Sequence, residues 1–145
     1  MENRWERIAA STLLSMMIIL TSCSKPEASA PAAAEPEAIS RTEFTDRVEN
    51  YFEYEHLHSG KPSQVRIHLT DLSDGAPVEK AEVSLTVRPK GGNDTVVQTT
   101  ARVGKVTGIY VADLIIPRTG EFDIEFRIRN AKLDERIPLT GFKVE

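Results

Sequence analysis

Cysteine is almost absent from this chain: its 145 residues include only one, Cys23. A single cysteine excludes an intramolecular disulfide, so the thiol needs another use. Methionine is absent after Met17, so the rest of the chain offers no soft sulfur ligand for a metal ion. The formal net charge of -4 argues against nucleic acid as a partner, because nucleic acids are bound by strongly basic surfaces.

The apolar run near the start is short as well. It occupies residues 8–20, fewer than the roughly 20 residues needed to span a bilayer. It follows Arg4 and Arg7, and a basic start before a short apolar core is typical of a signal peptide. We therefore predict that residues 1–22 are a signal peptide and belong to no folded domain.

The end of this segment reads "LTSC", residues 20–23. A branched residue, two small residues and a cysteine resemble the bacterial lipobox, which implies that Cys23 is acylated and becomes the new N-terminus. Several acyl chains anchor a protein stably in the lipid bilayer, whereas one chain is marginal. The alternatives are an ordinary signal peptide with a chance cysteine, or an uncleaved anchor. In lipoproteins of Gram-negative bacteria an aspartate after the cysteine favours inner-membrane retention, so Ser24 favours a periplasm-facing protein of the outer membrane.

The segment after the cysteine is rich in proline and alanine. Residues 24–38 read "SKPEASAPAAAEPEA" and contain no large apolar side chain. Such a segment cannot bury enough surface to offset the entropy of ordering it. We predict that residues 23–38 are a lipidated tether and that residues 39–145 form one domain.

Apolar and polar residues alternate along this domain with the period of β-strands. The clearest rows lie in residues 65–70, 83–88, 110–114 and 122–128, and weaker ones in 48–55, 95–101 and 136–144. Turn residues separate them, as at Asp74-Gly75 and Gly91-Gly92. About seven short strands at this spacing predict an all-β fold, an antiparallel β-sandwich.

Two segments of the domain support this prediction by resemblance. "DGAPVEKAEVSLTV" and "GIYVADLIIPRTGEFDIEFRI" are similar to patterns of bacterial immunoglobulin-like and transthyretin-like modules. In this pattern Tyr110 is expected to be half buried, with its ring in the core and its hydroxyl bound to the backbone.

A narrower resemblance runs through "FTDRVENYFEYEHLHSGKPSQVRIHLTDLSDGAPV", residues 44–78. This segment resembles the N-terminal periplasmic domain of adaptor subunits, or membrane fusion proteins, of heavy-metal efflux systems of the resistance-nodulation-division type. The features that match include "FEY" at residues 52–54 and "HLTDL" at residues 68–72. A full adaptor continues into a lipoyl-like domain, a helical hairpin and a barrel, which these 145 residues lack. The resemblance therefore implies an accessory subunit that binds an efflux adaptor or pump.

The three histidines are the candidate metal ligands. His56 and His58 are two residues apart, so in a continuing strand both side chains project to one side. His68 would approach them if the flanking strands pair across the turn at Gly60. Copper or zinc is the metal that such a set would hold, but a site needs about three or four ligands. The alternative is that the histidines are solvated loop and strand residues.

No motif for catalysis is evident in the sequence. It contains no nucleophile elbow and no phosphate-binding glycine loop, and we predict no catalytic or cofactor-binding residue and no enzyme. The favoured hypothesis is a lipoprotein whose β-sandwich binds another envelope protein in an efflux system. The alternatives are a periplasmic copper or zinc carrier that uses the three histidines, and a structural envelope lipoprotein unrelated to efflux.

Overall fold

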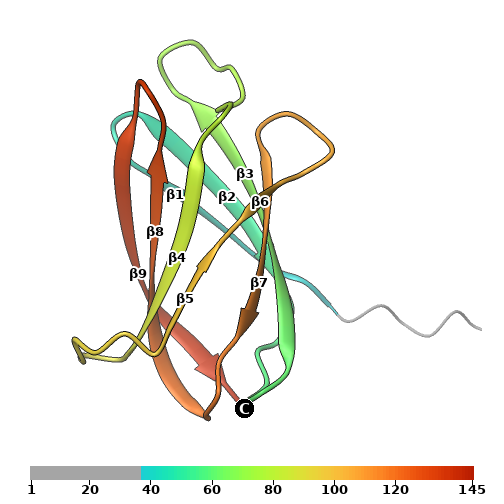
Figure 1. The fold of residues 1–145 in the computed structure, drawn as a ribbon, viewed down its shortest axis with the longest axis vertical. Coiled ribbons are helices and arrows are strands. Elements are labelled where there is room, and N and C mark those ends of the chain that lie inside the picture. The colour runs from blue at the N-terminus through green and yellow to red at the C-terminus, as the bar shows by residue number, and fades with distance from the viewer. Residues whose placement is uncertain (1–36) are drawn as a thin grey trace, which may run out of the picture. The chain divides into compact units, whose positions relative to one another are not determined.

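The computed structural model describes residues 37–145, which form an all-β sandwich (Figure 1). These residues form nine strands in two antiparallel sheets, and no helix among them is long and apolar enough to cross a membrane. The predicted fold class is therefore confirmed. The strands are β1 (Ile39–Phe44), β2 (Val48–Tyr54), β3 (Pro62–Asp71), β4 (Glu82–Pro89), β5 (Val97–Thr100), β6 (Arg102–Val103), β7 (Ile109–Ile115), β8 (Gly120–Arg129) and β9 (Asp134–Val144).

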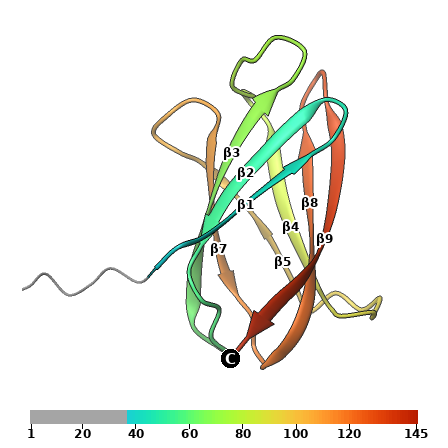
Figure 2. The ribbon, with the colours of Figure 1, turned by 180° about the vertical axis from the view of Figure 1, so that it is seen from behind.

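The two sheets are built from different sets of strands. Sheet A has the strand order β1-β2-β3-β7-β6, and sheet B has the order β5-β4-β8-β9. The strands β5 and β6 are nearly continuous in sequence but belong to different sheets, and the buried Ala101 lies between them. The chain therefore switches sheets at this side of the sandwich, whereas β1 and β9 leave the other side open (Figure 2).

The core lies between the sheets and consists of the inward-facing residues of each strand. Alternate residues are buried along β3, β4 and β8, as the period-two pattern predicts for strands with one face against the core. The largest fully buried side chains are those of Tyr110, Phe52, Phe122, Phe126, Phe142, Ile67, Leu85, Leu114 and Ile128. Phe52 of sheet A and Phe126 of sheet B have ring centroids 4.8 Å apart, so aromatic contacts join the two layers.

Two of the nine strands were not among the seven predicted. One is β1, whose partly buried inner face carries Ile39, Arg41 and Glu43, so its hydrophobic alternation is weak. The other is β6, which has only two residues, too few for any periodicity to be visible. The strand count was therefore too low at the two edges of sheet A, where packing imposes the weakest pattern on the sequence.

Arg41 bridges the side of the sandwich on which β1 and β9 do not pair. The guanidinium of Arg41 on β1 donates a 3.0 Å hydrogen bond to the carbonyl oxygen of Thr140 on β9. The same group lies over the ring of Phe142, 5.0 Å from the ring centroid, and over Phe52 at 5.9 Å. Its second nitrogen donates a 2.8 Å hydrogen bond to Glu43. Arg41 therefore links the free edges of the two sheets through polar and cation–π contacts.

Candidate functional site

The predicted lipid attachment site lies outside the described residues. Cys23, the signal peptide of residues 1–22 and the tether up to residue 36 all precede the part of the chain that the structure describes. The acylation of Cys23, the signal peptide and the tether therefore stay predictions from the sequence.

His56 and His58 lie in the connection between β2 and β3. Both side chains are exposed and flank the buried Leu57, which is the alternation of an extended segment, although β2 itself ends at Tyr54. Leu57 forms a parallel bridge with Val144, and the N–H of Glu145 donates to the carbonyl oxygen of Leu57. The histidines therefore lie on either side of a residue that pairs with the end of β9 at one end of the sandwich.

The carboxylate of Glu145 lies close enough to both histidines to be affected by their charge. The pKa of the Glu145 carboxyl is lowered mainly by the hydrogen bond and charge of Lys143, whose ammonium is 2.9 Å away. The two histidines lower the same pKa by smaller amounts. Glu145 is thus already engaged by a lysine and is not a free third ligand beside the imidazoles.

His68 lies elsewhere, and the expectation that it approaches the other two histidines is wrong. The strands β2 and β3 do pair, but their register places His68 opposite Tyr51. That position is three residues, roughly 10 Å, before the end of β2, and His56 lies beyond that end. The imidazole packs edge-on against the Tyr51 ring, with centroids 5.3 Å apart. Between Glu37 and Glu145 the structure contains no group of three or more histidine, cysteine or acidic residues able to hold a metal ion.

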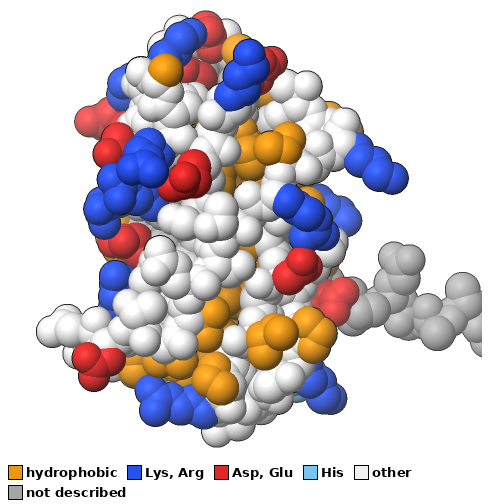
Figure 3. Space-filling view, in the orientation of Figure 1, with side chains coloured by type: hydrophobic (Ala, Val, Ile, Leu, Met, Phe, Trp, Pro, Cys, Tyr) orange, Lys and Arg blue, Asp and Glu red, His pale blue; other side chains and the backbone are white. Residues whose placement is uncertain are grey.

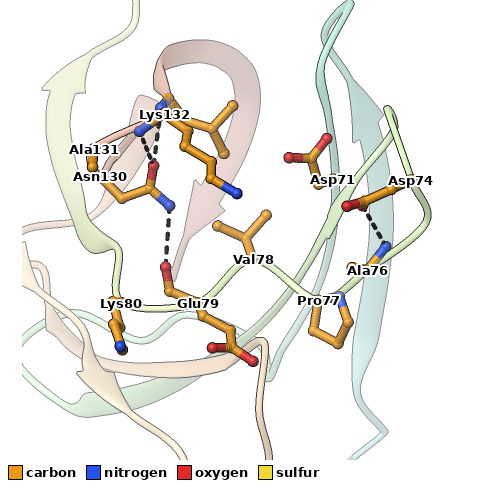
Figure 4. Close-up of a pocket in the computed structure, with 11 residues that line it drawn as sticks. Asp71, Asp74, Ala76, Pro77, Val78, Glu79, Lys80, Asn130, Ala131 and Lys132 are labelled. Atoms are coloured by element: carbon orange, nitrogen blue, oxygen red, sulfur yellow. Dashed lines mark hydrogen bonds between the residues drawn. The ribbon is translucent and has the colours of Figure 1, made fainter.

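A cavity of about 450 Å³ lies at the end of the sandwich where the β3–β4 loop meets the β8–β9 hairpin (Figure 4). Val78 and Leu133 are buried and form its apolar floor. The side chain of Lys132 extends from the hairpin toward Val78, and Asp71 at the end of β3 faces the same space. The cavity thus combines a small apolar surface with both acidic and basic residues; the acidic ones are Asp71, Asp74 and Glu79, and the basic ones are Lys80 and Lys132.

Local hydrogen bonds fix both loops around this cavity. The Asp71 carboxylate accepts hydrogen bonds from the hydroxyl of Ser73 at 2.6 Å and from its N–H at 2.9 Å, and these lower the pKa of Asp71. The side-chain oxygen of Asn130 accepts from two N–H groups of its own hairpin, and its amide nitrogen donates to the carbonyl oxygen of Glu79 at 3.1 Å. Asn130 therefore joins the hairpin to the β3–β4 loop.

The hydroxyl of Tyr110 secures the same loop from inside. It donates a 2.8 Å hydrogen bond to the carbonyl oxygen of Val78 and accepts a 3.1 Å hydrogen bond from the N–H of Ala81. The prediction of a backbone partner for this hydroxyl is confirmed, but Tyr110 is fully buried rather than half buried, since it is 1% exposed. Between the two bonded residues, Lys80 adopts a positive φ of 51°, which is unusual for a residue other than glycine.

The outer faces of the two sheets differ in character. On sheet B, acidic and basic side chains of neighbouring strands pair with one another; the pairs are Lys90–Glu121, Arg88–Glu125, Arg136–Glu125, Arg127–Asp134 and Arg129–Glu82. The large hydrophobic residues that are exposed in the described part of the chain all belong to sheet A or its connecting loops; they are Phe44, Leu72, Val103, Val106 and Ile115. In the described part of the chain, sheet A and its loops therefore expose more large hydrophobic side chains than sheet B does.

Sequence reasoning missed the cavity residues Asn130 and Lys132 and the role of Arg41. Asn130 opens the sequence "NAKLD", and an asparagine that starts a hairpin turn is a signal that could have been used. Arg41 carries no such signal, because its partner on β9, Thr140, is 99 residues away in sequence. No protein-family model, no curated protein and no solved structure matches this chain.

Proposed function

We propose that this chain is a bacterial envelope lipoprotein that acts as a binding module and not as an enzyme. The observation that carries the proposal is "LTSC" at residues 20–23, directly after a short apolar run with basic residues before it. In this proposal the Cys23 sulfur forms a thioether with a diacylglyceryl group. Residues 24–38 tether the β-sandwich to the outer membrane on its periplasmic side.

The surface of the domain supports a binding role. The exposed large hydrophobic side chains of the described domain lie on sheet A and its loops, whereas charges pair across the strands of sheet B. An exposed strand edge with hydrophobic side chains beside it suits contact with another protein. The Asp71 and Asn130 side chains of the cavity in Figure 4 are engaged in loop hydrogen bonds, which suits a structural role better than catalysis.

The partner that we propose is an adaptor or pump subunit of an efflux system for metals. This part rests on the resemblance of residues 44–78 to the N-terminal domain of such adaptors. The matching "FEY" and "HLTDL" lie at the end of β2 and the end of β3, on neighbouring strands of sheet A. In this role the domain works through protein contacts, and the transported metal does not bind to its histidines.

The lipid anchor can be tested by metabolic labelling with an alkyne analogue of palmitate in the bacterial host. We expect label on the natural chain and none on Cys23→Ala, because only that residue carries a thiol. The control Ser24→Ala should keep the label, although its distribution between inner and outer membranes can change. Equal labelling of Cys23→Ala would disprove acylation at this position.

The efflux role needs a separate experiment. Deletion of the gene should lower tolerance of the host to copper or zinc, and the natural chain should restore it. The Cys23→Ala variant should restore it less well if anchoring matters for access to the partner. Unchanged metal tolerance in the deletion strain would argue for a structural lipoprotein unrelated to efflux, even if the acyl label is present.

A further inference from the structure

The edges of the two sheets are not equally protected against pairing with another strand. An exposed edge offers unpaired N–H and C=O groups, and proteins block it with charges that point inward, bulges, proline or short strands. In sheet A, the edge strand β1 carries Arg41 and Glu43 on its inner face, and these charges disfavour a further strand. In sheet B, the edge strand β5 has only four residues.

The edge strand β9 is blocked in several ways. Pro138 lacks an N–H, and a register shift opposite residues 122–124 of β8 coincides with Gly141 at a φ of 83°. The carbonyl oxygen of Thr140 is already occupied by Arg41. Three of the four outer edges in the described domain therefore carry at least one recognised obstacle to strand addition.

The fourth edge, at β6, is incomplete. The two residues of β6 pair with Tyr110 and Val111 only, whereas β7 continues to Ile115. Before Arg102 the chain leaves for sheet B, where the N–H of Ala101 donates to Val83. Residues 112–115 of β7 thus pair with no strand of sheet A on this side, although β5 of sheet B lies close to β7, and we call them the open segment of β7.

The direction of the backbone groups in the open segment follows from the hairpin above it. The N–H of Ile109 donates to Val106 and its carbonyl oxygen accepts from Gly104, so both groups of Ile109 point to the β6 side. In an antiparallel sheet this direction repeats at every second residue. The N–H and C=O groups of Asp113 and Ile115 therefore point to the side on which no strand of the described domain pairs with them.

The side chains around the open segment are suited to apolar contacts. Ile115 is 50% exposed, and Val103 at the end of the neighbouring β6 is 66% exposed. Across the gap, Val97 of β5 packs against the core but is only partly buried. Figure 3 shows hydrophobic side chains in a broken stripe along this face, where sheet B gives way to β7. The Asp113 carboxylate does not disturb this surface, because it is paired with Arg102 at 2.6 Å.

We propose that the open segment of β7 is a docking site for an extended peptide strand of a partner protein, one with apolar residues at alternate positions. The strand adds to sheet A in line with β6 and pairs with the backbone of Asp113 and Ile115. Its side chains on one face lie near Val97, and those on the other face lie near Ile115. The backbone groups of the edge specify a strand as the occupant, and the neighbouring side chains specify its apolar character.

The open segment of β7 is thus the element by which the proposed binding module holds its partner. It rests on the proposed binding role but not on acylation or on efflux, so its failure would leave the labelling and tolerance experiments unaffected. A negative result for acyl labelling or for metal tolerance would in turn say nothing against strand docking at β7.

The test uses the full chain in detergent and a short peptide of alternating valine and threonine with lysine at both ends. Hydrogen–deuterium exchange should slow at Asp113 and Ile115 when this peptide is added. A matched peptide with N-methylated amides keeps the side chains but loses the hydrogen bonds, and it should give no protection. Ile115→Pro removes one edge N–H that makes no bond within the domain, and it should weaken binding by about tenfold.

Two further variants distinguish weaker peptide binding from loss of the fold. Ile115→Lys keeps the N–H but adds a charge to an exposed site, and it should also weaken binding while the thermal midpoint is retained. Phe44→Lys removes an exposed hydrophobic side chain from the far edge of the same sheet and should bind normally. Absence of protection at Asp113 and Ile115, or equal protection by the N-methylated peptide, would overturn the proposal. Protection that rises with protein concentration alone would assign the edge to a second copy and would also overturn it.

Discussion

The hydroxyl of Tyr110 donates a 2.8 Å hydrogen bond to the carbonyl oxygen of Val78, 32 residues earlier in the chain. Tyr110 lies on β7 of sheet A, and Val78 lies in the loop that carries the chain from sheet A to sheet B. The N–H of Ala81 donates to the same hydroxyl, so one buried oxygen satisfies two backbone groups of the loop. This contact holds the loop against the core and supports the floor of the cavity in Figure 4.

Removal of this hydroxyl should destabilise the domain without changing its fold. Tyr110→Phe keeps the buried ring but leaves the Val78 carbonyl and the Ala81 N–H without their partner. We expect the free energy of unfolding to fall by about 1–3 kcal/mol, the usual cost of unpaired buried polar groups. Chemical denaturation measures this change. A control at a partly buried tyrosine, Tyr51→Phe, loses a side-chain bond to Glu53 and should cost less.

A second prediction concerns Gly108, which packs against the same loop. It has a φ of 79°, and a Cβ atom at this position would lie 2.6 Å from the Cβ of Pro77. Gly108→Ala therefore adds a steric clash to the strain of a left-handed conformation. We expect a loss of about 2–4 kcal/mol from these two effects together.

The matched control for Gly108 is Gly75. It has a similar φ of 72°, but nothing lies within 4 Å of the added Cβ. Gly75→Ala should therefore show the backbone strain alone, about 1–2 kcal/mol. Thermal and urea unfolding of the two variants measure the difference. Equal losses at both sites would show that the contact between Pro77 and Gly108 is looser than the structure indicates.

The strands that were predicted most clearly are those with a fully buried inner face. In β8 the residues Phe122, Ile124, Phe126 and Ile128 alternate with polar residues, and all four are buried. The pattern is strong there because the inner face packs against the opposite sheet along the whole strand. The edge strand β1 was missed because Arg41 and Glu43 replace hydrophobic residues where the core meets solvent.

Pairing register and loop contacts could not be predicted in the same way. The alternation in β2 and β3 is compatible with several registers, and only the packed structure places His68 opposite Tyr51. The cavity needs two distant loops to meet, as Asn130 and Glu79 do although they are 51 residues apart in sequence. Each turn has its own local signal, but their meeting depends on the order of strands in both sheets.

The Asp71 carboxyl should titrate below its ordinary pKa of 3.8, because the hydroxyl of Ser73 and then its N–H bind the charged form. Because folding lowers this pKa, the charged Asp71 carboxylate stabilises the folded state at pH values above its ordinary pKa. The contribution is lost as the pH falls through the lower pKa of the folded state. Asp71→Asn should therefore be less stable than the natural chain near neutral pH, and the difference should shrink at acidic pH.

The cause of this shift can be isolated with Ser73→Ala. This variant removes the 2.6 Å hydroxyl hydrogen bond and keeps the N–H of the same residue. The pKa of Asp71 should rise toward its ordinary value, and carbon NMR of the carboxyl resonance measures it directly. If the pKa stays unchanged, the charges of Arg47 and Lys132 outweigh the serine as the cause.

The metal hypothesis yields the last prediction. His56 and His58 are both exposed, but His68 lies on β3 opposite Tyr51, and zinc sites in proteins use about four ligands. Titration of the chain with zinc or copper should therefore show weak binding at most, and His68→Ala should leave it unchanged. Any weak binding should disappear when His56 and His58 are both replaced by alanine, because no other pair of histidines in the described domain is adjacent. Sub-micromolar, stoichiometric binding that is lost in His68→Ala would require a different register of β2 and β3, and would restore the carrier hypothesis in place of a protein-binding module.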